Sequence, residues 1–269
     1  MRIDLPAFAN KADLYSYLVK RKEDIFQLKR NEVKKSETFM HSPILLKPEE
    51  ASKAEGQGEN LDTDFELKRR IVGNTYYWMD SHEDVHLSGC FAVSIKQRGA
   101  KKIYFYHDHL NQLTAKVGNF EKVYEKEIAW KDLGIDKEGN TESLFADAAI
   151  KKAYNEKIFE MYKSGEIDQH SVGMQYVKLD LAINDPEYKA EYAEWQKVYP
   201  LLGNPETADK TGYFFTVKEA RLFEISCVPD GSNILTPTQS INDPSKDSQE
   251  HTDPSQGSQT KQNLFIDLI

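Results

Sequence analysis

Three short polar motifs in the sequence combine residue types that serine hydrolases use, and each stands at the edge of a predicted strand. They are His107-Asp108-His109, Ser171-Val172-Gly173 and Glu224-Ile225-Ser226. A hydrolase of this type needs a hydroxyl nucleophile, an imidazole that removes its proton and a third group that orients the imidazole. A serine, a histidine and a carboxylate on three strands of one sheet supply these roles if the fold brings them together.

Ser171 opens a predicted strand in which it shares a face with Gly173, while Val172, Met174 and Tyr176 share the other face. Because glycine lacks a side chain, another backbone, such as a substrate chain, can approach this face closely. The alternative is an ordinary strand with a serine on its solvent side, and the motif taken alone favours that alternative.

Each of the other chemical residues also has a structural interpretation. His107 and His109 alternate on a strand and could share a metal ion, but only His82 and His86 lie near enough to add ligands, and zinc sites need three or four. Glu224 could be a solvent-facing strand residue. The remaining candidates read as structural: His170 points to the face opposite Ser171, and Cys90 and Cys227 lie in apolar strands, as buried cysteines do.

Composition excludes several classes of protein. The net charge of −9, with Lys68-Arg69-Arg70 as the main basic block, argues against nucleic-acid binding. No apolar run is long enough to span a bilayer, and the first residues show no signal-peptide pattern. The two cysteines have no metal-type spacing, which fits a soluble protein of a reducing cytoplasm.

The chain divides into three parts by composition. Residues 1–64 are predicted to be a helical lead and a flexible linker, and residues 65–236 the main domain, with an insertion at about 185–211. Residues 237–269 are predicted to be a disordered tail that ends in an apolar peptide, Asn263–Ile269, which either docks to a partner or caps the core.

Periodicity predicts the elements of the main domain. Residues 65–78 read as a strand with a bulge at Gly73, and residues 102–109 as a strand that runs into a polar loop. Residues 141–165 show the clearest helical pattern, from a Thr141 cap to Gly165. In the insertion, residues 187–199 are predicted to form a polar helix, and Asp80 and Asp84 an Asx-type turn.

Four motifs in this order resemble the prohead (procapsid maturation) proteases of tailed phages, which are related to the herpesvirus assemblins. The resemblance covers about residues 65–235. It rests on Ile71-Val72-Gly73-Asn74 with the acidic turn 80–85 and Gly89-Cys90-Phe91; on Tyr106-His107-Asp108-His109 with Val117-Gly118; on Gly165 with Ser171-Val172-Gly173; and on Leu222-Phe223-Glu224-Ile225-Ser226 with Asn233.

The resemblance implies an α+β fold with an antiparallel, partly barrel-like sheet flanked by helices. It implies that Ser171 is the nucleophile and Glu224 the acidic partner, with backbone amides at Val172 and Gly173 receiving the oxyanion. The base is His109 or His107; spacing slightly favours His109. Neither a metal nor a cofactor is implied. The insertion at 185–211 is longer than the family pattern, which weakens the assignment of Glu224.

The function that the resemblance implies is that of a serine endopeptidase of virion assembly. It would cleave scaffold protein, major capsid protein and itself inside an immature phage head, in the cytoplasm of the host bacterium. A homo-oligomer is compatible with this expectation, and neither nucleic acid nor membrane is an expected partner. The alternative is a non-catalytic capsid-assembly or scaffold protein that retains the protease fold.

Overall fold

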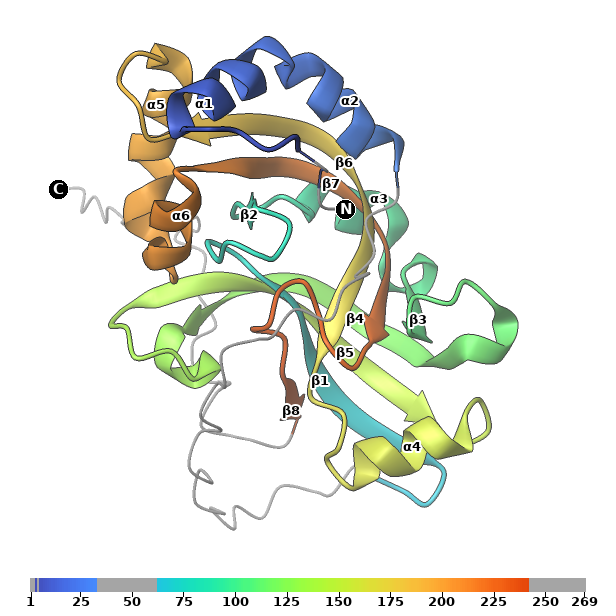
Figure 1. Ribbon diagram of the computed structural model, residues 1–269. Coiled ribbons are helices and arrows are strands. Elements are labelled where there is room, and N and C mark those ends of the chain that lie inside the picture. The colour runs from blue at the N-terminus through green and yellow to red at the C-terminus, as the bar shows by residue number, and fades with distance from the viewer. Residues whose placement is uncertain (1–2, 4, 33–61, 242–269) are drawn as a thin grey trace, which may run out of the picture.

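The computed structural model describes residues 3, 5–32 and 62–241 of the chain. These residues form an α+β fold in which helices flank an open, eight-stranded mixed sheet (Figure 1). The strands are β1 (Glu66–Thr75), β2 (Asp84–His86), β3 (Tyr104–His107), β4 (Lys116–Ala129), β5 (Asn140–Lys151), β6 (His170–Ile183), β7 (Tyr213–Cys227) and β8 (Thr238–Ser240). The helices are α1 (Lys11–Lys20), α2 (Lys22–Asn31), α3 (Ala92–Arg98), α4 (Glu156–Lys163), α5 (Lys189–Val198) and α6 (Pro205–Thr211).

Strand β7 organises the sheet because it pairs with three other strands. It runs antiparallel to β6 over almost its whole length, and parallel to β2 near its start and to β3 near its end. The prediction of an antiparallel sheet is therefore wrong in this respect. A local sequence pattern cannot predict whether two strands pair in parallel, because a parallel pair needs a long crossover connection. Here β4, β5 and β6 lie between β3 and β7 along the chain.

The helix predicted for residues 141–165 is wrong in its first half, where residues 140–151 form β5. This strand lies between β4 and β1 and is buried on both faces, so its sequence does not alternate and its apolar residues imitate a helical stripe. The second half is helical as α4. Asn155 caps α4 by accepting a hydrogen bond from the Ile158 amide at 3.1 Å.

Other predicted elements are confirmed. β1 has its register shift between Val72 and Asn74, where Gly73 was predicted to form a bulge. The insertion contains α5 within the predicted residues 187–199, and α6 after it. Trp195 of α5 and Ala208 of α6 belong to a hydrophobic cluster with Phe214 of β7, so the insertion is packed on the sheet.

Helices α1 and α2 lie along β6 and share the main hydrophobic core with the sheet (Figure 1), because Leu18 and Phe26 are buried in that core. A buried ion pair adds to this contact: Lys29 Nζ of α2 lies 2.6 Å from Asp84 Oδ1 of β2, and both side chains are 0% exposed.

Asp80 makes the predicted Asx-type turn by accepting from the amides of His82 and Asp84. The Asp84 carboxylate instead binds Lys29.

The two flanking segments are described only in part. Residues 238–240 pair with β1 as strand β8, although the sequence predicts a disordered tail from residue 237. Residues 33–61, which hold most of the predicted linker, and the apolar terminal peptide lie outside the described residues.

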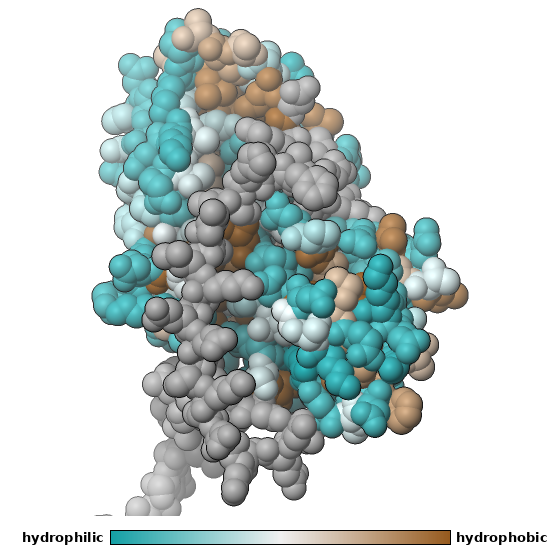
Figure 2. Space-filling model, turned by 60° about the horizontal axis from the view of Figure 1, so that its bottom comes forward, coloured by the Kyte–Doolittle hydropathy of each residue, from teal (hydrophilic) through white to brown (hydrophobic). Residues whose placement is uncertain are grey.

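The surface drawn in Figure 2 is hydrophilic over much of its lower right part, with hydrophobic side chains gathered toward the top. Among the described helices, none combines the length and the apolar composition that crossing a membrane requires.

Candidate active site

A tight turn after β3 holds His109. The amide of Leu110 donates to the His107 carbonyl at 3.1 Å, and the two residues between them, Asp108 and His109, have φ angles of 52° and 54°. Two successive left-handed residues define a type I′ turn, a conformation that favours Gly, Asn or Asp. The Asp108 amide donates to Cys227 O at 3.0 Å and so ties the turn to β7. A histidine in the left-handed conformation raises the free energy of the native state locally, and such strained residues are concentrated at functional sites.

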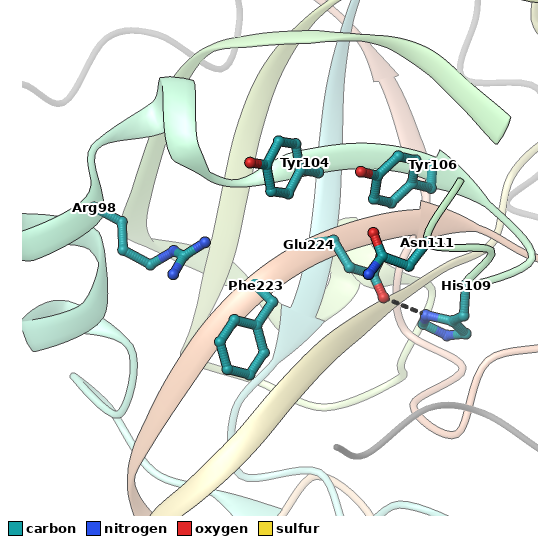
Figure 3. A pocket seen from close by; sticks show the side chains of 7 residues that line it. All are labelled: Arg98, Tyr104, Tyr106, His109, Asn111, Phe223 and Glu224. Carbon is teal, nitrogen blue, oxygen red and sulfur yellow. Dashed lines mark hydrogen bonds and ion pairs between the residues drawn. The ribbon is translucent and has the colours of Figure 1, made fainter. Parts of the chain in front are cut away.

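The turn directs the His109 ring to Glu224 on β7. His109 Nδ1 lies 2.6 Å from Glu224 Oε1, and the two side chains are only 5% and 9% exposed (Figure 3). A carboxylate accepts from Nδ1–H, which makes Nε2 the basic nitrogen of the neutral ring. This is the relation between an imidazole base and the acid that orients it.

The other carboxylate oxygen of Glu224 is also bound. Ser226, fully buried and two residues farther along β7, donates from Oγ to Glu224 Oε2 at 2.6 Å. Ser226 belongs to the third polar motif of the sequence, but no role was predicted for it. With one oxygen on Ser226 and the other on His109, the carboxylate has little freedom to rotate.

Gly173 makes room for this carboxylate. It stands opposite Glu224 in the β6–β7 pairing, and a Cβ atom on Gly173 would lie 2.0 Å from Glu224 Oε1 and 2.6 Å from Cδ. The predicted close approach at Gly173 therefore exists, but the group that approaches is the Glu224 side chain and not a substrate backbone.

Ser171 lies on the same face of the sheet. It stands opposite Ser226, and opposite side chains on one face of an antiparallel pair have Cβ atoms about 4.5–5.5 Å apart. Its exposed fraction is 5%, so it lies below the surface at the start of β6 and beside the serine that binds Glu224. Ser171 and Glu224 therefore lie on one face of the β6–β7 pair, and His109 contacts Glu224.

The backbone amides predicted to receive the oxyanion face opposite ways. Val228 N donates to Gln169 O at 3.1 Å, and hydrogen-bonded pairs alternate along an antiparallel ladder. Alternation from that pair turns the amides of Ser171 and Gly173 toward β7 and the Val172 amide away from it. The Gly173 amide is therefore part of the ladder, and the Val172 amide is not.

His107 hydrogen-bonds to Asp108 and not to the Glu224 carboxylate. It is in register with Cys227 in the parallel β3–β7 pair, whereas Tyr104 and Tyr106 are in register with Glu224 and Ser226. Its Nδ1 lies 2.8 Å from Asp108 Oδ2. His107 and His109 were predicted to lie on one strand, but β3 ends at His107, and the turn that follows reverses the direction of the chain.

A pocket of about 320 Å³ borders His109 and Glu224 (Figure 3). Its remaining lining residues are Arg98, Tyr104, Tyr106, Asn111 and Phe223. Burial raises the pKa of Tyr106, and the neighbouring Tyr104 and Glu224 raise it further, so this hydroxyl is neutral. None of these five residues was predicted to belong to the site, although alternation along β3 puts Tyr104 and Tyr106 on one face.

His170 has a structural role, as its predicted direction suggested. It is fully buried, with Nε2 2.8 Å from Tyr162 Oη and Nδ1 2.9 Å from the Thr236 carbonyl. Because a carbonyl can only accept, Nδ1 carries the proton and Nε2 accepts from the tyrosine. Burial lowers the pKa of His170 from 6.5 to about 4, so the native state holds the neutral ring.

The free energy of unfolding should fall in acid because of His170. The unfolded chain binds a proton at this ring near pH 6.5, whereas the native chain does so only near pH 4. The contribution is therefore complete above pH 6.5 and is lost between about pH 6.5 and 4, by up to roughly 3 kcal/mol. Urea denaturation across this range should give a shallower pH slope for His170→Gln than for the native chain; equal slopes would contradict the assignment.

The other candidate ligands and nucleophiles are buried. The described residues contain no group of three or more His, Cys, Asp or Glu side chains able to hold a metal ion. Burial raises the pKa of Cys90 strongly and that of Cys227 to about 12, so both remain thiols at neutral pH.

Comparison of the chain with protein-family models, with curated proteins and with solved structures gives no match in any of the three.

Proposed function

We propose that this protein is a serine endopeptidase in which Ser171 is the nucleophile, His109 the general base and Glu224 the carboxylate that orients the base. The observation that carries the proposal is the His109–Glu224 pair: a buried imidazole, 2.6 Å from a buried carboxylate, at the wall of a pocket. The position of Ser171 on the same face of the sheet adds to this support.

In the proposed mechanism, His109 Nε2 takes the proton of Ser171 Oγ while this oxygen attacks the scissile carbonyl carbon. The Val172 amide is the proposed donor to the resulting oxyanion. The imidazolium, stabilised by Glu224, gives its proton to the leaving amine as the C–N bond breaks and the acyl-enzyme forms. Water then repeats the sequence on the ester and releases the acid.

The proposed setting is the maturation of a phage prohead, with scaffold protein, major capsid protein and the protease itself as substrates, inside immature heads in a bacterial host. The order of the four motifs and their resemblance to prohead proteases support this part, and an assemblin-like fold is proposed with it. The chain would act there without a cofactor, as a monomer or a homo-oligomer.

The proposal can be tested by covalent labelling with a fluorophosphonate probe, which requires an activated serine but no knowledge of the substrate. We expect the purified full chain to be labelled at one residue, with mass spectrometry locating the adduct on Ser171. Labelling should disappear in Ser171→Ala and in His109→Ala, and should persist in Ser164→Ala, a control at an exposed serine after α4.

An adduct on Ser226 would show that Ser226, and not Ser171, is the nucleophile. No labelling above the level of Ser171→Ala, in a chain that is folded by circular dichroism, would favour the alternative of a non-catalytic capsid-assembly protein that keeps this fold.

A further inference from the structure

The pocket beside His109 and Glu224 is built mainly of aromatic rings. Tyr104 and Tyr106 stack on each other, with centroids 5.6 Å apart and planes inclined by 24°. Phe223 lies across from them and occupies the register shift of β7, between the residues that pair with Met174 and Gly173 (Figure 3). A bulge of this kind re-aims a side chain and is common beside active sites.

Arg98 stands at the far end of the pocket from the His109–Glu224 pair (Figure 3). Its Nε and Nη2 both donate to the Lys102 carbonyl, at 3.1 and 2.6 Å, so these donors are already used within the protein. Its guanidinium also lies 5.3 Å from the centroid of the Phe223 ring, in a cation–π contact. Arg98 therefore extends the aromatic wall as a fixed, flat cation.

The exposure of these residues points to a ligand. Tyr104 is 45% exposed although its strand, β3, lies between β7 and β4 in the sheet. Leu110, which lies between His109 and the lining residue Asn111, is 41% exposed. A concave site with exposed aromatic walls and a few polar groups at its ends is the usual form of a binding site for an apolar group.

We propose that this pocket binds an aromatic side chain of the substrate, held between the Tyr104–Tyr106 stack and the Arg98–Phe223 wall. This inference rests on the proposed function, since it makes the pocket a specificity site for the same reaction. The negative face of an aromatic ring suits both the fixed guanidinium and the edges of the neighbouring rings. The volume of about 320 Å³ is that of about ten water molecules in the liquid, enough for a large side chain.

Binding of small probes tests the proposal independently of catalysis. N-acetyl-phenylalaninamide, N-acetyl-glutamate amide and N-acetyl-alaninamide would be titrated into the full chain carrying Ser171→Ala, with the tyrosine ring signals followed by NMR. We expect the phenylalanine probe to bind roughly tenfold more tightly than the alanine probe. Phe223→Ala and Tyr104→Ala should each remove most of this difference. Tyr154→Ala, a control at another tyrosine with 42% exposure that does not line the pocket, should not.

Equal binding of the phenylalanine and alanine probes would overturn the proposal. Tighter binding of the glutamate probe, lost in Arg98→Met, would also overturn it, because Arg98 would then be a receptor for an anion. Because Tyr104 is half exposed, its variant folds even if Phe223→Ala does not. Aromatic selectivity without fluorophosphonate labelling would mean that the proposed function is wrong but the pocket assignment is right, whereas labelling without selectivity would mean the reverse.

Discussion

Gly173→Ala is expected to reduce the proposed peptidase activity by roughly 10²–10⁴-fold while the chain stays folded. The new Cβ atom would lie 2.0 Å from Glu224 Oε1 and 2.8 Å from Cγ, distances that non-bonded atoms do not adopt. The atoms it meets belong to a side chain and not to the backbone, so Glu224 would rotate away and the strand pairing would remain. His109 would then lose the hydrogen bond that sets its orientation.

A double-mutant cycle distinguishes this mechanism from general damage to the sheet. In a Glu224→Ala background the added methyl group has no carboxylate to displace, so Gly173→Ala should cause little further loss of activity. Rates would be measured on a peptide cut by the native chain, with circular dichroism melts of all four proteins. Full activity of Gly173→Ala, or an equal loss in both backgrounds, would disprove the account of this glycine.

The second prediction with a large expected effect is that replacing Lys29 destabilises the fold. Lys29→Ala should lower the free energy of unfolding by about 3–5 kcal/mol, because it leaves the Asp84 carboxylate buried without its cation. Tyr176 also donates to Asp84, and Phe215 lies 4.4 Å from the Lys29 amine, so the surroundings are closed to water that might otherwise solvate the remaining charge. Urea denaturation of the full chain measures this loss.

Lys22 supplies a matched control on the same helix. Its amine lies 2.9 Å from Glu191, with side chains 26% and 9% exposed, so water can reach the site of the amine and Lys22→Ala should lower the free energy of unfolding by less than Lys29→Ala does. Replacing both buried partners, as Lys29→Met with Asp84→Asn, should recover much of the stability lost in Lys29→Ala, because no unpaired charge remains. Equal losses for Lys22→Ala and Lys29→Ala would show that the burial of the pair is energetically unimportant.

Local sequence was sufficient for several elements. β1 with its bulge at Gly73, the strand that begins near Ser171 and helix α5 could all be predicted from the order of their side-chain types, although residues 71–75 of β1 and 170–174 of β6 are buried on both faces. The same reasoning failed for β5. That strand is covered on both faces, so its apolar residues carry no period that separates a strand from a helix.

The chemistry of the candidate site was partly visible in residue types and partly hidden in geometry. A serine, a histidine and a glutamate at strand edges suggested a hydrolase, and His109 and Glu224 are hydrogen-bonded in the fold. The choice between His107 and His109 could not be made from spacing, since it depends on a turn with two positive φ angles. The role of Gly173 also depends on the strand opposite it.

The sequence by itself determined the kinds of groups available, the bounds of the regular half-buried elements and the absence of a nucleic-acid or membrane signature. Only the tertiary structure decided which groups meet: the parallel pairing of β3 with β7, the support of Glu224 by Ser226, and the aromatic pocket beside them. The physical reason is that periodicity and propensity report a residue's immediate neighbours along the chain. Contacts between residues more than a hundred positions apart, such as His109 and Glu224, depend on how the whole sheet is assembled.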